Sequence, residues 1–206
     1  MSRADEPEVA EVDTPQGPAR AHLHLAEKPR AALVLGHGAG GGVEAPDLVV
    51  ATEVATETGV SVALIEQPYR VAGKRSSPAP ARLDEAWLAA VEALRAGELG
   101  GLPLIAGGRS AGARVACRTA AQSGAVAMLC LAFPEHPPGK PEKTRQAELD
   151  AVEVPVLVVQ GESDPFGMPR ASSTCTVVAV PGNHGLKTDR DAVAAAIRAW
   201  LPQIVG

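Results

Sequence analysis

The sequence predicts an α/β fold with a mostly parallel central sheet and helices on both of its faces. Short apolar runs alternate with helical patterns along most of the chain, which is typical of successive strand–helix–strand units. Most of these runs are apolar throughout, as expected for parallel strands that are buried on both faces. Antiparallel pairing is expected only for the N-terminal hairpin, whose strands at 9–14 and 19–25 are joined by a short Pro-Gln-Gly-Pro turn.

Length and composition favour a single domain over residues 9–206, preceded by a flexible tail at 1–8. The chain has 206 residues, of which 46% are hydrophobic and only 2% aromatic, so its core must consist largely of Ala, Val and Leu. No apolar run is long enough for a transmembrane helix. The acidic first residues lack the apolar segment of a secretory signal, so the expected location is the cytoplasm.

Charge and cysteine content limit the partners and ligands that we expect. A formal net charge of −5 gives no electrostatic reason to bind nucleic acid or an anionic membrane. Cys117, Cys130 and Cys175 lie in apolar stretches without metal-ligand spacing, so buried free thiols are expected. His22 and His24 form an H-x-H pair on the solvent side of a strand, and no third ligand lies at a suitable spacing. We therefore expect neither a metal nor a cofactor.

In the first half of the chain, Pro and Gly residues mark the ends of the predicted elements. A helix is indicated by Pro46 near its start and Gly59 at its end. A later helix carries one apolar stripe that includes Leu83, Trp87 and Leu94. The expected strands are 31–35 and 61–65, the helices 47–59 and 81–96, and the basic, proline-containing loop 70–80.

The second half of the chain repeats this pattern and ends in an amphipathic helix. The helix that follows the third buried strand should end at Ser123-Gly124, where glycine permits a left-handed cap. The expected strands are 102–106, 126–133, 154–160 and 174–180, and the helices are 111–122, 142–149 and 189–201. Because the carboxyl ends of parallel strands share one edge of a sheet, residues that follow these strands should gather there.

The stretch around Ser110 carries the strongest chemical signal. Gly108, Ser110 and Gly112 form a G-x-S-x-G sequence between a predicted strand and a predicted helix, which is the context of a nucleophile elbow. A side chain at either glycine would collide with a neighbouring strand or helix as the chain reverses. In a chain with 21 glycines the pattern can also arise as an ordinary turn with a helix-capping serine.

Two further residues complete the pattern of a catalytic serine. A serine hydroxyl needs a base within hydrogen-bond reach, and that base needs a third group to orient it. Asp164 and His184 each follow a predicted strand, and the chain order Ser, Asp, His is the one found in α/β-hydrolases. Glu162 competes with Asp164 for the role of the acid.

Stabilisation of a tetrahedral oxyanion requires two backbone N–H donors. The expected donors are Ala111, directly after the serine, and Ala39, in the glycine-rich loop that follows the first buried strand. His37 in the same loop is expected to support that loop by hydrogen bonding. His136 lies in a proline-rich loop that could overhang the site, and either histidine could touch substrate.

The same glycine-rich loop also fits a dinucleotide-binding fingerprint. Gly36, Gly38 and Gly41 form G-x-G-x-x-G after a strand, and Glu66 ends the next strand, where a ribose-binding acid would stand. A dinucleotide site needs its helix to open within the fingerprint, whereas here the helix is expected near Pro46. The hydrolase interpretation is therefore favoured.

Six sequence segments together resemble one branch of the α/β-hydrolases. They are Leu35-Gly-His-Gly-Ala-Gly-Gly, Glu66-Gln-Pro-Tyr-Arg70, Leu83-Asp-Glu-Ala-Trp87, Gly107-Gly-Arg-Ser-Ala-Gly-Ala-Arg-Val-Ala116, His136-Pro-Pro-Gly-Lys140 and Gly182-Asn-His184. The branch is that of the testis-expressed and NSL-complex-subunit-3 hydrolase-like domains, whose small bacterial members are related to dienelactone hydrolases. The resemblance covers about residues 20–202, and its most specific part surrounds Arg109 and Arg114.

This resemblance implies an α/β-hydrolase fold without a large cap domain and a triad of Ser110, Asp164 and His184. It implies no particular substrate, and some relatives belong to larger assemblies, so a catalytically silent interaction domain is an alternative. Arg109 is expected either to contact an acidic substrate or to pair with a carboxylate such as Glu66. Tyr69 and Phe166 either line the substrate pocket or serve in packing. The expected partner is a small acyl substrate, and the sequence does not determine the oligomeric state.

Overall fold

The sheet of the computed structural model, which describes residues 7–206, confirms the predicted α/β architecture. Its strands run in the order β1-β2-β4-β3-β5-β6-β7-β8. Strand β2 is antiparallel to both of its neighbours, β1 and β4, and the five other neighbouring pairs are parallel. Residues 1–6 of the expected flexible tail lie outside the described part, and β1 begins at Glu8.

Strands and helices alternate along the chain after the N-terminal hairpin. The strands are β1 (Glu8–Val12), β2 (Ala19–His24), β3 (Ala31–Gly36), β4 (Val60–Glu66), β5 (Leu104–Arg109), β6 (Ala127–Leu131), β7 (Val156–Gly161) and β8 (Cys175–Val180). The helices are α1 (Pro46–Glu57), α2 (Pro68–Val71), α3 (Pro80–Ala96), α4 (Ala111–Arg118), α5 (Ala120–Ser123), α6 (Gln146–Asp150) and α7 (Arg190–Val205).

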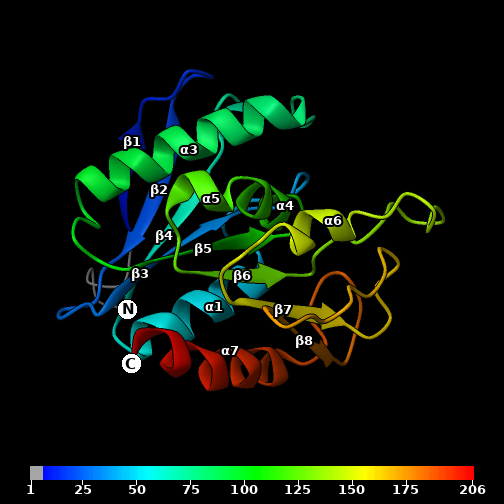
Figure 1. Ribbon diagram of the computed structural model, residues 1–206. Helices are drawn as coiled ribbons and strands as arrows, with labels where there is room; N and C mark the ends of the chain where they lie inside the picture. The colour runs from blue at the N-terminus through cyan, green and yellow to red at the C-terminus, as the bar shows by residue number, and fades with distance from the viewer. Residues whose placement is uncertain (1–6) are drawn as a thin grey trace.

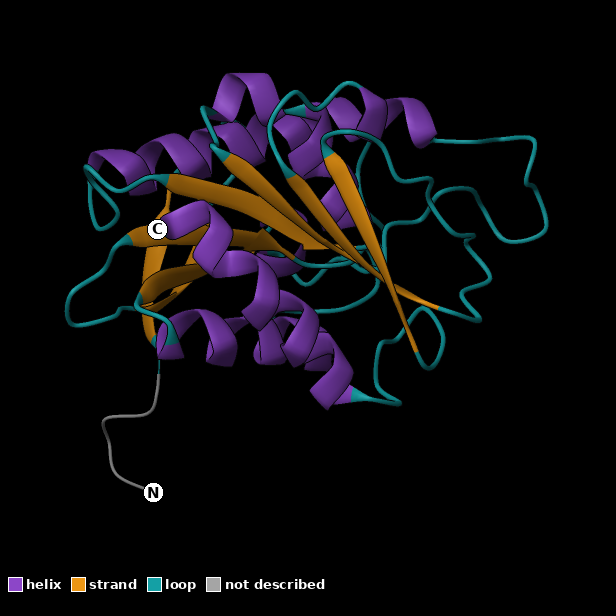
Figure 2. Ribbon diagram, turned by 60° about the horizontal axis from the view of Figure 1, so that its bottom comes forward, coloured by secondary structure: helices purple, strands orange, loops and turns teal. Residues whose placement is uncertain are grey.

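Helices cover both faces of the twisted sheet, as Figures 1 and 2 show. Helices α1 and α7 lie side by side on one face, and α3, α4 and α5 lie on the other (Figure 1). Two buried clusters result, one on each face, and both consist mainly of Ala, Val and Leu. The two tryptophans serve different faces, since Trp87 of α3 and Trp200 of α7 belong to opposite clusters. With so few aromatic residues, the core volume is filled by aliphatic side chains from continuous apolar strands.

Several element boundaries differ from those expected. The helix predicted over 111–122 is interrupted at Thr119, whose hydroxyl donates to the carbonyl of Val115 at 2.8 Å, and α5 then leads to Gly124 in the left-handed conformation. A one-turn helix, α2, lies at the start of the segment expected to be a loop. The helix expected at 142–149 is shortened to α6, because the backbone before it is bonded elsewhere: the N–H of Arg145 donates to the carbonyl of Glu135 at 2.7 Å, and the Thr144 hydroxyl accepts from the N–H of Gln146 at 3.1 Å.

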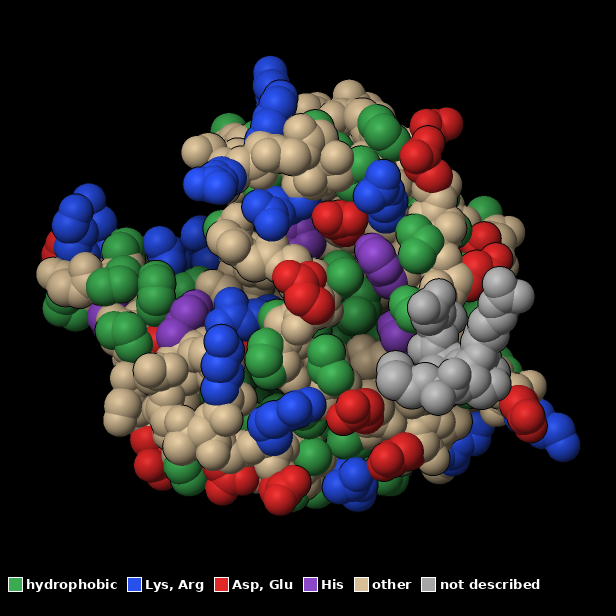
Figure 3. Space-filling model, turned by 180° about the vertical axis from the view of Figure 1, so that it is seen from behind, with side chains coloured by type: hydrophobic (Ala, Val, Ile, Leu, Met, Phe, Trp, Pro, Cys, Tyr) green, Lys and Arg blue, Asp and Glu red, His purple; other side chains and the backbone are tan. Residues whose placement is uncertain are grey.

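The loops that follow β3, β5, β7 and β8 bring the expected functional residues to one edge of the sheet. Since these strands are parallel, their carboxyl ends meet there. Elsewhere the surface is mixed in charge: Lys and Arg side chains are interspersed with Asp and Glu on the face shown in Figure 3. Over residues 7–206, no helix combines the length and the apolar character needed to cross a bilayer.

Candidate active site

Ser110 stands on a sharp turn between β5 and α4. Its backbone has φ 52° and ψ −111°, a region that a residue with a side chain rarely adopts. The glycines around it allow this turn to pack against β3. A Cβ atom on Gly108 would lie 2.5 Å from the carbonyl oxygen of Gly36, and one on Gly112 would come closer still to the same oxygen. Both glycines are therefore required by close backbone approach, as the sequence predicts.

A continuous hydrogen-bond chain joins Ser110, His184 and Asp164. The Ser110 Oγ is 2.9 Å from His184 Nε2, and His184 Nδ1 is 2.8 Å from Asp164 Oδ2. The Asp164 side chain is 1% exposed and that of His184 18%, so the acid is shielded while the imidazole edge reaches the cleft. A carboxylate that accepts from Nδ1–H leaves Nε2 free to accept the serine proton. Glu162, the competing acid, is exposed and takes no part in this chain.

Asp164 is itself held in place from two sides. Its Oδ1 accepts a hydrogen bond from the backbone N–H of Phe166 at 2.8 Å, and its Oδ2 accepts from Gln160 Nε2 at 2.9 Å. Gln160 is fully buried, and its amide nitrogen also lies within hydrogen-bond distance of the carbonyls of Phe133 and Gly167. Gln160 thus ties the acid to two neighbouring loops. A buried amide at the end of an apolar strand is the signal in the sequence that could have identified it.

Phe166 covers the imidazole of His184. The two ring centroids are 4.1 Å apart with an interplanar angle of 32°, so the rings are in contact in a tilted arrangement. Phe166 also lines the cleft. Both roles expected from the sequence, as a pocket-lining residue and as a packing residue, therefore apply to it. This contact limits rotation of the imidazole away from Ser110.

Arg109, the last residue of β5, connects the start of α1 with the loop that carries His184. Its Nε forms an ion pair with Asp47 Oδ2 at 2.8 Å, and a terminal nitrogen donates to the backbone carbonyl of His184 at 2.9 Å. Asp47 is fully buried at the start of α1, where burial raises the pKa of its carboxyl and the nearby Arg109 charge opposes that rise. Of the two expected roles for Arg109, the structure shows the pairing with a carboxylate, but this carboxylate is Asp47 and not the suggested Glu66, which lies near Arg20 and His22 of β2.

The loop after β3 is held by two side chains that lie beneath it. His37 is buried, its Nδ1 is 2.8 Å from the carbonyl of Gly38, and its Nε2 accepts from the backbone N–H of Gln67 at 3.1 Å. Burial lowers the pKa of His37, which favours the neutral ring that this arrangement needs. The Tyr69 hydroxyl donates to the carbonyl of Ala39 at 3.0 Å. Both side chains support the loop, and neither lines the cleft beside Ser110.

The two expected oxyanion donors both lie at that cleft. Ala111 is the first residue of α4, so its N–H has no acceptor within the helix. Ala39 also lines the cleft, and the loop that carries it is anchored by His37 and Tyr69. The structure thus places the Ser110 hydroxyl, the His184 imidazole and the two residues expected to supply the backbone donors around one cleft.

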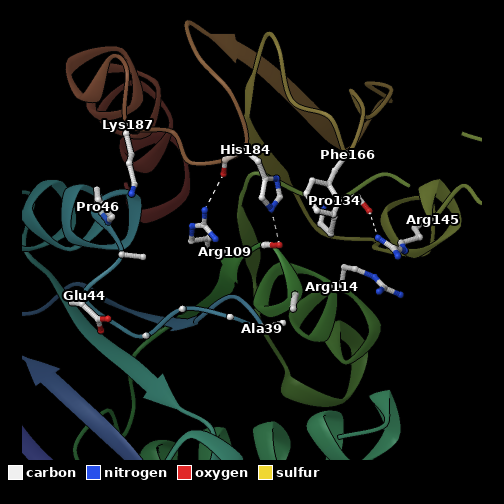
Figure 4. Close-up of a pocket in the computed structure, with 16 residues that line it drawn as sticks. Ala39, Glu44, Pro46, Arg109, Arg114, Pro134, Arg145, Phe166, His184 and Lys187 are labelled. Carbon is white, nitrogen blue, oxygen red and sulfur yellow. Dashed lines mark hydrogen bonds between the residues drawn. The ribbon is translucent and has the colours of Figure 1, made fainter. Parts of the chain in front are cut away.

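The cleft has a volume of about 730 Å³ and opens directly above Ser110. Figure 4 shows His184 near its centre, with Lys187, Pro46 and Glu44 on one side and Phe166, Pro134, Arg114 and Arg145 on the other. Ser110 also lines the cleft. His136 does not line it: its Nδ1 faces the carbonyl of Pro137 at 2.9 Å.

The dinucleotide interpretation does not fit the geometry of the glycine-rich loop. Helix α1 begins only at Pro46, after the last glycine of the fingerprint, so no helix N-terminus opens within it. The first turn of α1 holds buried Asp47, whose negative charge disfavours a phosphate. Among residues 7–206, no group of three or more His, Cys, Asp or Glu side chains is placed to hold a metal ion.

A family model described as an alpha/beta hydrolase domain matches residues 29–192 of the chain. No curated protein sequence matches it. The matched segment contains β3 to the start of α7, and with them Ser110, Asp164 and His184.

Solved structures with the same fold cover nearly the whole chain. XC6422 from Xanthomonas campestris, described as a serine hydrolase without lid, is 22% identical with a TM-score of 0.76, and the match covers 98% of each chain. Est1E from Butyrivibrio proteoclasticus, with ferulic acid bound, is 19% identical with a TM-score of 0.80, over 95% of this chain and 99% of that one. A dienelactone hydrolase from Anabaena variabilis is 18% identical with a TM-score of 0.75, over 97% and 99%. At these identities the likeness establishes the fold.

Proposed function

The chain belongs to the α/β-hydrolase domain family, and from this premise we propose that it is a serine hydrolase of small esters, thioesters or lactones. The observation that carries the proposal is the hydrogen-bond chain from Ser110 through His184 to Asp164 at the floor of an open cleft. Two structural neighbours, Est1E with its bound ferulic acid and the dienelactone hydrolase, agree with this substrate class.

In the first half of the reaction, the Ser110 Oγ attacks the acyl carbon while His184 Nε2 removes the hydroxyl proton. The resulting imidazolium is stabilised by Asp164, which accepts from Nδ1–H at 2.8 Å. The tetrahedral oxyanion accepts hydrogen bonds from the N–H groups of Ala111 and Ala39. Collapse of the intermediate expels the alcohol or thiol, which takes its proton from His184 Nε2, and leaves an acyl-Ser110 ester.

In the second half, a water molecule attacks the acyl-Ser110 ester and gives its proton to the same imidazole nitrogen. The second tetrahedral intermediate uses the same two backbone donors. Its collapse returns the proton to Ser110 Oγ and releases the carboxylic acid. The reaction requires no group beyond this chain's residues and water.

Replacement of Ser110 tests this proposal. The purified protein should hydrolyse short p-nitrophenyl esters, and Ser110→Ala should reduce kcat/KM by about 10⁴-fold or more, because the nucleophile is lost. The melting temperature should stay nearly unchanged, since Ser110 is a partly exposed elbow residue that packs against little. A wild-type protein that is inactive on a broad panel of esters and thioesters would favour the silent interaction domain. Stabilisation by a nicotinamide dinucleotide would instead favour the nucleotide-binding alternative.

A further inference from the structure

The cleft beside Ser110 contains more positive than negative side chains. Its lining includes four basic residues and one acidic residue, Glu44. The basic residues are Arg109, Arg114, Arg145 and Lys187. Whether this surplus is available to a substrate depends on which of the cations already have a carboxylate partner in the protein.

Two of the arginines are neutralised by the protein itself. Arg109 is paired with buried Asp47. Arg114 makes a two-pronged contact with Glu148, with its Nε 2.8 Å from one carboxylate oxygen and a terminal nitrogen 2.6 Å from the other. Behind this pair, Arg118 is bound in the same way to Asp84 and also lies 3.6 Å from Glu148. The two positive charges of Arg114 and Arg118 thus equal the two negative charges of Glu148 and Asp84, so this group of four side chains has no net charge.

Arg145 is different, because among residues 7–206 no carboxylate forms an ion pair with it. Its one side-chain hydrogen bond within that range goes from a terminal nitrogen to the carbonyl of Pro134 at 2.9 Å. The nearby Glu135 carboxylate accepts a hydrogen bond from the hydroxyl of Thr144. Burial and the neighbouring Arg114 charge lower the pKa of Arg145, yet a guanidinium remains protonated at any ordinary pH. Among residues 7–206 it is a half-buried cation with no carboxylate within ion-pair distance, and the charges of Glu148 and Glu135 act on it only from farther away.

The side of the cleft toward Arg145 carries two apolar side chains, together with the ion-paired Arg114. Phe166 and Pro134 lie between His184 and Arg145 in Figure 4. On the other side of Ser110, the charged residues Lys187 and Glu44 are both exposed to solvent. The acyl group stays bound through both halves of the reaction while the leaving group departs early. The half-buried side, toward Arg145, therefore suits the acyl group. The open side, toward Lys187 and Glu44, suits the departing alcohol or thiol.

We propose, as a refinement that rests on the serine-hydrolase function, that the acyl group of the substrate ends in a carboxylate bound by Arg145. The substrate class is thus the half-ester or half-thioester of a short dicarboxylic acid. Phe166 and Pro134 contact its methylene chain, and the guanidinium of Arg145 donates to its far carboxylate. Arg145 is the half-buried cation of the lining that has no ion-pair partner among residues 7–206, whereas Lys187, which also has none there, is exposed to solvent. One carboxylate matches the single charge of Arg145.

A matched pair of substrates tests this proposal. Mono-p-nitrophenyl adipate and p-nitrophenyl hexanoate have the same chain length and differ only in the terminal carboxylate, and the Ser110→Ala protein supplies the blank for spontaneous hydrolysis. Wild-type kcat/KM should be higher for the adipate half-ester. Arg145→Gln should lower that value by about 10- to 100-fold, the loss expected for a hydrogen bond to a charged group, and change the hexanoate value less than about threefold. Arg145→Lys should give an intermediate loss, because it keeps the charge without the planar fork.

Lys143→Gln is the matched control, since it removes one positive charge from the same segment at an exposed position that does not line the cleft. It should leave the ratio of the two kcat/KM values unchanged. If Arg145→Gln lowers kcat/KM equally for the adipate and the hexanoate ester, Arg145 acts only through its hydrogen bond to Pro134 and the proposal is wrong. A wild type that prefers the hexanoate ester would overturn it as well.

A binding measurement separates this inference from the proposed function. Free adipate should bind the wild-type protein in isothermal titration calorimetry, about tenfold or more tightly than it binds Arg145→Gln, and the affinity should weaken as salt is added. This result does not depend on turnover. An enzyme that hydrolyses hexanoate but binds adipate equally with and without Arg145 retains the proposed function and loses the carboxylate specificity. Arg145-dependent binding of adipate without any ester hydrolysis would instead support the carboxylate site and contradict the proposed function.

Discussion

Arg109 directly precedes Ser110 in the chain, and its side chain also contacts two other segments of the site. It contacts both the start of α1, through Asp47, and the backbone carbonyl of His184. Its own backbone ends β5, directly before Ser110. The Arg109 guanidinium therefore helps to set the relative positions of nucleophile and base, together with the contacts of His184 to Asp164 and Phe166, and we infer that Arg109 is a positioning residue.

Arg109→Lys tests this role. A lysine keeps a positive charge for Asp47 but has no fork with which to reach Asp47 and the His184 carbonyl together. We expect kcat to fall about 10- to 100-fold, as for a small misplacement of reacting groups, with KM nearly unchanged. The measurement is steady-state kinetics on a p-nitrophenyl ester well below the melting temperature. A purely structural role would lower the melting temperature and leave kcat of the folded fraction intact.

Among the elements, β3 and α4 cross in close backbone contact near the site. Gly36 of β3 meets Gly112 of α4, and a Cβ atom on Gly112 would overlap the Gly36 carbonyl oxygen. Backbone atoms of two buried elements cannot move apart without displacing Ser110 or the loop that carries Ala39. The elbow and the oxyanion loop are in this way built as one unit.

Gly112→Ala should destabilise the protein although alanine favours a helix by about 1 kcal/mol over glycine. The clash with backbone outweighs that gain, and we expect a loss of about 2 kcal/mol or more in the free energy of unfolding, as for overpacked cores. Urea denaturation measures it. Gly40→Ala is the control, because a Cβ atom there would have no atom within 4 Å beyond its chain neighbours, and the stability should change little. An unchanged or raised stability for Gly112→Ala would show that the crossing is not tight.

The sequence predicts these elements well where the signal is local and poorly where it depends on distant partners. The strand–turn–helix around Ser110 and the order of Ser110, Asp164 and His184 are local features, and the structure brings these three residues together. The pairing of Arg109 with Asp47 joins segments far apart in the chain, and several carboxylates fit the same pattern. Gln160 was missed for the same reason, because its acceptors lie on loops whose proximity only the folded sheet creates.

At the scale of the whole molecule, the parallel sheet places the ends of β3, β5, β7 and β8 along one edge. The loops there supply Ala39, Ser110, Asp164 and His184, and they leave an open cleft of about 730 Å³ beside Ser110. An open cleft gives a small ester direct access to the nucleophile. It also gives access to a reactive phosphonate, which makes the central claim directly measurable.

The most direct test is covalent labelling of the intact wild-type protein with a fluorophosphonate, followed by mass spectrometry of its peptides. An activated serine hydroxyl displaces the fluoride and keeps the phosphonyl group, whereas unactivated serines do not react. We predict one adduct per chain, located on Ser110, and its loss in the Ser110→Ala and His184→Ala proteins. A folded wild-type protein that remains unlabelled, or that is labelled at another serine, would contradict the proposed role of Ser110.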